Sequence, residues 1–167
     1  MKVSHVDETL ARDEDAEQAA TRLARAKAAA VAREEQRPIL AADTLVVCDG
    51  RILGKPASPK DAADMLRALS GRDHDVVTAV CLLSDGVLRT AVDRTTVTFA
   101  ALSEAAIAWY VATEEPLDKA GAYHVDGRGA LFIPRVAGAP SNVAGLPVRT
   151  MLTLAREAGI DLGLGKS

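Results

Sequence analysis

The sequence has 167 residues, of which 49% are hydrophobic and 26% charged, with 20 Lys+Arg against 23 Asp+Glu. These proportions are typical of one globular domain and exclude a disordered or fibrous chain. A formal net charge of −3 argues against a protein that coats nucleic acid or an anionic membrane through bulk positive charge. Cys48 and Cys81 lie in apolar runs, so we expect two buried, reduced thiols rather than a zinc site.

The first residues, from Met1 to Glu8, contain no apolar stretch, and nowhere do about 18 apolar residues follow one another without a break. We therefore expect a cytoplasmic protein that does not enter a membrane.

The first half of the chain predicts a helix, a hairpin and a second helix. Apolar residues recur at steps of three and four from Asp15 to about Glu35, which is typical of an amphipathic helix. Residues 39–48 are apolar and β-branched, and Asp49-Gly50 joins them to residues 51–53 in a predicted hairpin. Ser58 and Pro59 then favour the start of a helix that ends at Ser70-Gly71.

The second half predicts another hairpin and more helices. The hairpin arms are residues 74–84 and 87–99, joined at Asp85-Gly86. A helix begins at Ser103, a strand covers residues 130–136, and a last helix runs from Val148 towards Gly159. Helices that alternate with two hairpins predict an α/β fold with a mixed sheet, in one domain that covers residues 1–167.

Asp43 is the first candidate for chemistry, because with Thr44 it interrupts an apolar strand. A buried carboxylate needs a partner, which could be a lysine, a metal or backbone N–H groups. The alternative is that Asp43 ends a short strand and caps a turn. Lys55, in Gly54-Lys55-Pro56, could contact a phosphate, or it could be an ordinary surface turn residue. The spacing of the glycines does not match a Walker motif.

A polar loop that ends in small residues, from Glu114 to Tyr123, is a further candidate, since such loops allow a ligand to approach the backbone closely. The alternative is that Asp118 and Lys119 only form a charge pair that stiffens a turn. His5, His74 and His124 have no metal-ligand spacing, and we expect them to fill turns or partly buried polar positions.

Taken together, these motifs resemble the Maf family of nucleoside triphosphate pyrophosphatases. The matching segments are Ala42-Asp43-Thr44, Gly54-Lys55-Pro56, Ala62 to Leu66, Leu69-Ser70-Gly71, His74 to Thr78, Pro116 to Tyr123, and Asn142 to Pro147. The resemblance implies a fold of the inosine-triphosphate pyrophosphatase type and a cytoplasmic homodimer. It also implies hydrolysis of a nucleoside triphosphate to the monophosphate and pyrophosphate with a divalent metal, Mg²⁺ or Mn²⁺.

The resemblance also implies roles for single residues at the phosphate end of the substrate. Asp43 matches the catalytic aspartate, which is the expected proton acceptor and a metal ligand. Glu8 matches an acidic residue near the metal and the phosphates. Lys27 and Lys55 match lysines that face the triphosphate. These two lysines and one divalent cation would offset most of the roughly four negative charges of the substrate.

Three further positions are implied to bind substrate. Thr44 matches a position linked to base selection and favours the dTTP/UTP subgroup, and Lys119 lies in the polar loop. Asp126 stands where that subgroup usually has an amide, and a carboxylate can only accept hydrogen bonds. The preferred base therefore stays open at this point.

One departure concerns the N-terminus, because family members open with a strand and a Ser-x-Ser-Pro-Arg-Arg loop that bind phosphate. We expect the native chain to begin upstream of Met1. If it does not, a sheet without that strand predicts weak stability or self-association. The main alternative to an enzyme is a non-catalytic relative that binds nucleotides or a partner protein. A scaffold without a ligand ranks third, because it leaves Asp43 and Lys55 unexplained.

Overall fold

An antiparallel sheet of five strands forms the centre of the computed structural model, which describes residues 6–9, 14–35 and 37–163. The strand order is β2-β1-β3-β4-β5, and all four neighbouring pairs are antiparallel. The strands are β1 (Ile39–Cys48), β2 (Arg51–Leu53), β3 (Asp73–Ser84), β4 (Val87–Thr98) and β5 (Arg135–Ala137).

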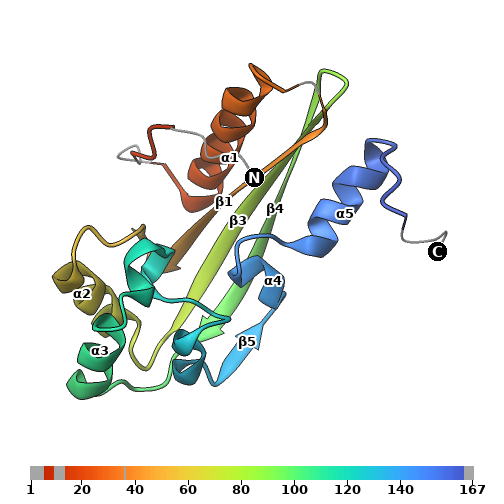
Figure 1. Ribbon diagram of the computed structural model, residues 1–167. Helices are drawn as coiled ribbons and strands as arrows, with labels where there is room; N and C mark the ends of the chain where they lie inside the picture. Colours follow the sequence, from red (N-terminus) through yellow and green to blue (C-terminus); the bar gives the residue numbers. More distant parts are fainter. Residues whose placement is uncertain (1–5, 10–13, 36, 164–167) are drawn as a thin grey trace.

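Helices cover both faces of the sheet, as Figure 1 shows. The helix α1 (Ala16–Ala32) packs on one face, and α4 (Pro140–Val143) and α5 (Val148–Glu157) pack on the other. The helices α2 (Pro59–Leu69) and α3 (Glu104–Val111) lie together at one end of the long strands. Three short 3₁₀ helices follow α3, namely η1 (Glu115–Asp118), η2 (Ala120–Ala122) and η3 (Arg128–Phe132).

Alternation along β1 decides which side chain faces which layer. Leu45 belongs to the apolar cluster under α1, whereas Val46 belongs to the cluster that includes α2 and α3. Since successive side chains on a strand point to opposite faces, Asp43 shares a face with Leu45, and Thr44 shares one with Val46. The strand thus presents adjacent polar side chains to opposite faces of the sheet.

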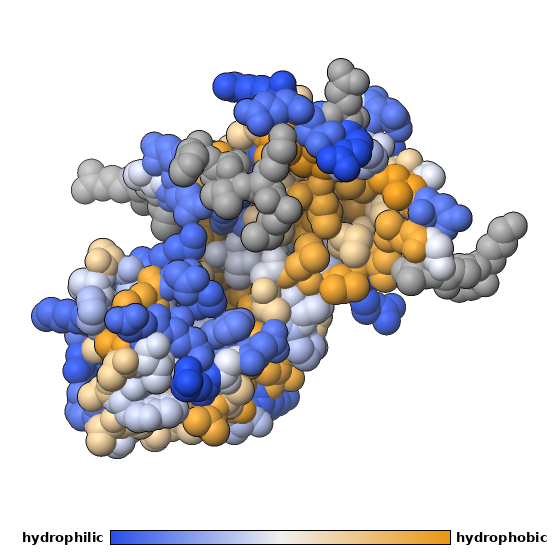
Figure 2. All heavy atoms as spheres, viewed as in Figure 1, coloured by the Kyte–Doolittle hydropathy of each residue, from blue (hydrophilic) through white to orange (hydrophobic). Residues whose placement is uncertain are grey.

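β1 also has a partly free edge, which matters for the site. β3 pairs with residues 39–47 of β1, but β2 pairs only with residues 46–48 on the other side. Among the residues that the structure describes, no strand therefore pairs with that side of residues 39–45. An apolar groove lined by Val31, Ile39 and Leu146 runs along this edge. Figure 2 shows hydrophobic side chains gathered in the region between α1 and α5.

Most predicted elements are confirmed, including both hairpins and the helices capped by Asp15, Ser58 and Ser103. Both cysteines are buried and free. The fold is of the predicted α/β class, but the described strands pair only antiparallel, so the mixed pairing predicted for the sheet is not seen in them. Two of the four antiparallel pairs are hairpins, because β1 and β3 each lead into the next strand through a two-residue turn.

One alternative is wrong and one prediction is only partly confirmed. β1 continues through Asp43 and Thr44 without a break, so Asp43 does not end a short strand. Of the strand predicted over residues 130–136, only the last two residues lie in β5, whereas residues 130–132 belong to η3. There the ring of Phe132 packs edge-on against that of Tyr110 in the core, at 5.1 Å between centroids. In the described part of the chain, no helix is both long and apolar enough to cross a membrane.

Candidate active site

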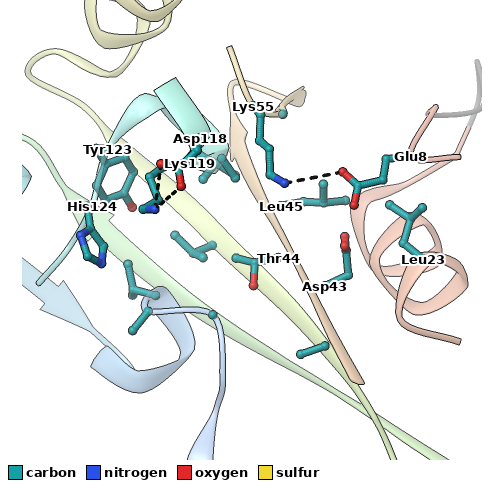
Figure 3. Close-up of a pocket in the computed structure, with 18 of the residues that line it drawn as sticks. Glu8, Leu23, Asp43, Thr44, Leu45, Lys55, Asp118, Lys119, Tyr123 and His124 are labelled. Atoms are coloured by element: carbon teal, nitrogen blue, oxygen red, sulfur yellow. Dashed lines mark hydrogen bonds and ion pairs between the residues drawn. The ribbon is translucent and has the colours of Figure 1, made fainter. Parts of the chain in front are cut away.

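A cleft of about 590 Å³ opens at the free edge of β1, and residues from both faces of the sheet line it. Asp43 and Thr44 both line this cleft, although they point to opposite faces, because the cleft passes around the strand edge. The turn after β2 contributes Lys55, and η1 and η2 close another side (Figure 3). The cleft therefore has one end on the α1 side of the strand and another on the α4 side.

The end on the α1 side is charged. The Nζ atom of Lys27, on α1, lies 2.5 Å from Oδ1 of Asp43 and 2.8 Å from Oε1 of Glu8. The Nζ atom of Lys55 lies 3.9 Å from Oε2 of Glu8, as the dashed line in Figure 3 marks. Asp43 is 7% exposed, whereas the side chain of Lys55 is 60% exposed. One buried carboxylate is thus surrounded by more accessible charged groups.

These contacts shift the pKa of each group. Burial raises the pKa of Asp43 above its usual value, although Lys27 opposes this shift. Burial would lower the pKa of Lys27, but its hydrogen bonds to Asp43 and Glu8 outweigh burial and raise it. The hydrogen bond from Lys27 lowers the pKa of Glu8. A carboxylate with a raised pKa is better suited to accept a proton from water near neutral pH.

The loop that carries Lys119 is held against the cleft by a close backbone contact. The backbone N–H of Gly121 donates to the carbonyl oxygen of Gly54, at 3.0 Å, next to Lys55. Gly121 has φ +68°, and a Cβ atom there would lie 2.9 Å from Val46. Glycine is needed at this position for both reasons. The Nζ atom of Lys119 contacts both carboxylate oxygens of Asp118, at 2.7 and 2.8 Å.

The end on the α4 side has one ion pair among the described residues that line it, that of Lys119 with Asp118 beside Tyr123 (Figure 3). Thr44 Oγ1 lies 2.9 Å from Thr78 Oγ1, directly across the β1–β3 pair. The ring of Tyr123 also lines this end, and its hydroxyl lies 2.9 Å from Nε2 of the buried His74. Burial lowers the pKa of His74 to about 4, so this histidine is neutral at pH 7.

The structure brings together most of the residues predicted from the sequence. The ones that line the cleft are Glu8, Lys27, Asp43, Thr44, Lys55 and Lys119. Asp126 is exposed and is not among the lining residues. His124 lines the cleft, and His5 lies outside the described residues.

Sequence reasoning missed the residues that hold the loop with Lys119 in place beside the cleft. Glu115 accepts hydrogen bonds from the Tyr110 hydroxyl, at 2.9 Å, and from the backbone N–H groups of Arg128 and Gly129, at 3.1 Å. These bonds fasten the two ends of the loop that contains Lys119. Only the position of Glu115 just before Pro116, in an already suspected loop, could have drawn attention to it.

The carboxylates of Glu8 and Asp43 fit a hard divalent cation. Both lie within hydrogen-bond distance of the same ammonium group, that of Lys27, so they converge on one region of the cleft. The described residues contain no group of three or more His, Cys, Asp and Glu side chains that could enclose a metal. Mg²⁺ commonly binds through one or two carboxylates and completes its shell with substrate phosphates and water. Two carboxylates in an open cleft of about 590 Å³ match that pattern.

Comparison with known proteins places this site in a family. The family model described as Maf-like protein matches residues 1–158. A dTTP/UTP pyrophosphatase of Anaeromyxobacter dehalogenans (strain 2CP-C) is 51% identical over 145 residues, which cover 84% of this chain and 73% of that protein. A nucleoside triphosphate pyrophosphatase of Haemophilus ducreyi is 43% identical over 165 residues, which cover 95% and 84%. The chain belongs to the Maf family.

Proposed function

We propose that this protein is a nucleoside triphosphate pyrophosphatase, which hydrolyses a nucleoside triphosphate to the monophosphate and pyrophosphate. The observation that carries the proposal is the buried Asp43 in a cleft where Lys27, Lys55 and Glu8 form the charged cluster around it. The names of the relatives support the same reaction.

In this proposal Asp43 accepts a proton from the water that attacks the α-phosphorus. The bond between the α-phosphorus and its bridging oxygen then breaks, and pyrophosphate leaves with that oxygen. The raised pKa of Asp43 supports its role as the base. Lys27 and Lys55 hold the phosphates and offset the charge that develops on the leaving group.

Glu8 and Asp43 are the residues that would hold Mg²⁺ or Mn²⁺. The cation supplies positive charge that neutralises the phosphates when it is bound. Lys27 contributes a second, permanent positive charge to the same region, because its pKa is raised.

The end of the cleft on the α4 side is proposed to take the base. Thr44 lies at this end, and Lys119 lies on the loop that borders it. Several relatives are named dTTP/UTP pyrophosphatase, which supports a preference for these nucleotides. A role for Asp126 in binding the base rests on the resemblance alone, since this residue lies outside the cleft lining.

A homodimer in the cytoplasm is part of the same proposal. Exposed apolar side chains such as Leu40, Val92 and Val148 are compatible with burial in a second copy. Sedimentation of the purified chain at micromolar concentration tests this assembly, and a monomer at every concentration contradicts it.

The experiment that tests the function is pyrophosphate release from a panel of nucleoside triphosphates, including dTTP, UTP, CTP, ATP and GTP, with Mg²⁺ or Mn²⁺. We expect release of pyrophosphate and the monophosphate in equal amounts from at least one of them, and none after chelation of the metal. Saturable nucleotide binding without hydrolysis, in this chain and in a version extended to an upstream in-frame start, would instead favour a non-catalytic relative.

A further inference from the structure

Two threonine hydroxyl groups, hydrogen-bonded in series, lead from the cleft into the core; we call them the hydroxyl chain. Thr44 Oγ1 lies 2.9 Å from Thr78 Oγ1, and Thr78 Oγ1 lies 3.1 Å from the backbone carbonyl oxygen of Asn142. Thr78 is completely buried on β3, while Thr44 is half-buried and lines the cleft. The first hydroxyl of this chain therefore faces a ligand, and the second is sealed behind it.

The backbone carbonyl of Asn142, at the inner end of the hydroxyl chain, fixes the direction of both hydrogen bonds. A carbonyl oxygen only accepts, and each threonine hydroxyl has one proton. Both close oxygen–oxygen contacts contain a proton only if Thr78 donates to Asn142 and Thr44 donates to Thr78. The hydroxyl of Thr44 then has no proton left for the cleft, and it presents only lone pairs.

Several hydrogen bonds hold Asn142 rigidly at the inner end of the hydroxyl chain. Its side-chain amide donates to the carbonyl oxygen of Val76, at 3.0 Å, and to Thr95 Oγ1, at 2.9 Å. Its own carbonyl also accepts from the backbone N–H of Gly145, at 2.9 Å. Asn142 is completely buried, so these bonds are shielded from water. The direction of the hydroxyl chain is thus built into the core and does not depend on a ligand.

We propose that Thr78 is a positioning residue that determines base specificity by holding the hydroxyl of Thr44 as a hydrogen-bond acceptor. The cleft then favours bases whose ring presents an N–H donor, as uracil and thymine do. Cytosine presents an acceptor nitrogen at the same ring position, so two acceptors would face each other and remain unpaired. This inference rests on the proposed function, and it adds a residue that touches no substrate.

The position of the charges supports a base rather than phosphate beside Thr44. The ammonium of Lys27 and the carboxylate of Glu8 lie with Asp43 on the α1 side of β1. Thr44, Tyr123 and the segment 143–145 contribute uncharged lining on the α4 side. The charged residues beside Tyr123 are Asp118 and Lys119, which pair with each other (Figure 3). Tyr123 adds an aromatic ring, a surface on which bases commonly stack.

The test compares UTP with CTP in the wild type, in Thr78→Val and in Thr78→Ser. Valine fills nearly the same volume without a hydroxyl, so the hydroxyl of Thr44 becomes free to rotate and to donate. We expect the ratio of kcat/KM for UTP to that for CTP to fall about tenfold in Thr78→Val, mainly through KM, because the base contact is present in both ground and transition states. Thr78→Ser restores the hydroxyl and should restore the ratio.

Binding of the α,β-methylene analogues of UTP and CTP, which cannot be cleaved at that bond, gives a readout that is independent of catalysis. A preference for the UTP analogue that is lost in Thr78→Val and regained in Thr78→Ser supports the proposal. Equal loss for both nucleotides would indicate a merely structural role and overturn it, as would a wild type with no preference between the analogues. A wild type that hydrolyses no nucleotide would contradict the proposed function while leaving the binding result to decide this inference.

Discussion

The two ends of the cleft hold their polar groups in different ways. At the charged end, Lys27 is shared between Asp43 and Glu8, and Glu8 also faces the exposed Lys55. At the α4-side end, Thr44 bonds to the buried Thr78, which bonds to the backbone. The charged groups around Asp43 pair with one another, and a substrate with its metal can replace those pairings. The hydroxyl groups of Thr44 and Thr78 are instead held by the core without a ligand.

This difference indicates a division of tasks. Catalysis of phosphoryl transfer requires charged side chains that can rearrange around the substrate. Recognition of a base requires hydrogen-bond donors and acceptors that are oriented before the base binds. Changes of single residues test this division, and Asp43 should show the largest effect.

Asp43→Asn should abolish most of the activity, because the amide cannot accept the proton from the attacking water. We expect kcat to fall by about 10²- to 10⁴-fold, the usual contribution of a general base. The fold should tolerate the change, since burial already disfavours the ionised form of Asp43. Pyrophosphate release and thermal melting, measured on the same samples, test both statements. Unimpaired hydrolysis would remove Asp43 from its proposed role.

A proton on His74 would place a charge in the buried layer behind Tyr123, so the free energy of unfolding should depend on pH in a specific window. The pKa of His74 falls from 6.5 to about 4 on folding because of burial. In the unfolded chain His74 therefore becomes protonated below about pH 6.5, whereas in the folded chain it stays neutral down to about pH 4. The contribution of neutral His74 to the free energy of unfolding is fully present above about pH 6.5. It is lost as the pH falls through this window, which lowers the free energy of unfolding by about 3 kcal/mol.

Urea denaturation of the wild type and His74→Gln at pH 7 and at about pH 4.5 measures this effect. Glutamine can still bond to the hydroxyl of Tyr123 but does not titrate, so its stability should fall less between the two pH values. Carboxylates that titrate in the same range contribute equally to both proteins. Parallel losses in the two proteins would show that His74 is not the group responsible.

Some residues of the cleft could be selected from the sequence and others could not, for physical reasons. Asp43, Lys55 and Lys119 lie in short local motifs, and local sequence sufficed to select them. The role of Thr78 depends instead on the register of β1 against β3, which places it opposite Thr44. That register is a property of the folded sheet, and no pattern within either strand shows it.

The fold shows the same contrast between local and long-range determinants. Both Asp-Gly turns were predicted, and Asp49 and Gly50 have φ values of +49° and +74°, as a two-residue hairpin turn requires. The apolar run at 130–136 was predicted as a strand, yet only its last two residues lie in β5, whereas Phe132 packs against Tyr110 within η3. Its partner ring lies more than twenty positions earlier in the chain, beyond the reach of local propensity.

Lys55→Met should weaken phosphate binding moderately. The side chain of Lys55 is 60% exposed and lies 3.9 Å from Glu8, so water screens its charge. We expect KM for the nucleotide to rise about tenfold, with a smaller change in kcat. Lys60→Met is the matched control, because Lys60 is 86% exposed on α2 and is not among the residues that line the cleft. If both variants weaken binding equally, the overall charge rather than the position of Lys55 is responsible.

Asp126→Asn should have the smallest effect. The resemblance assigns this position to the base, where an amide could donate as well as accept. In the structure Asp126 is exposed and belongs to neither end of the cleft. We therefore expect kcat/KM for UTP and for CTP to change less than about twofold, since exposed polar groups away from a site contribute little. A larger change in the ratio of the two would show that the substrate reaches beyond the cleft, and that part of the base preference is set outside the hydroxyl chain of Thr44 and Thr78.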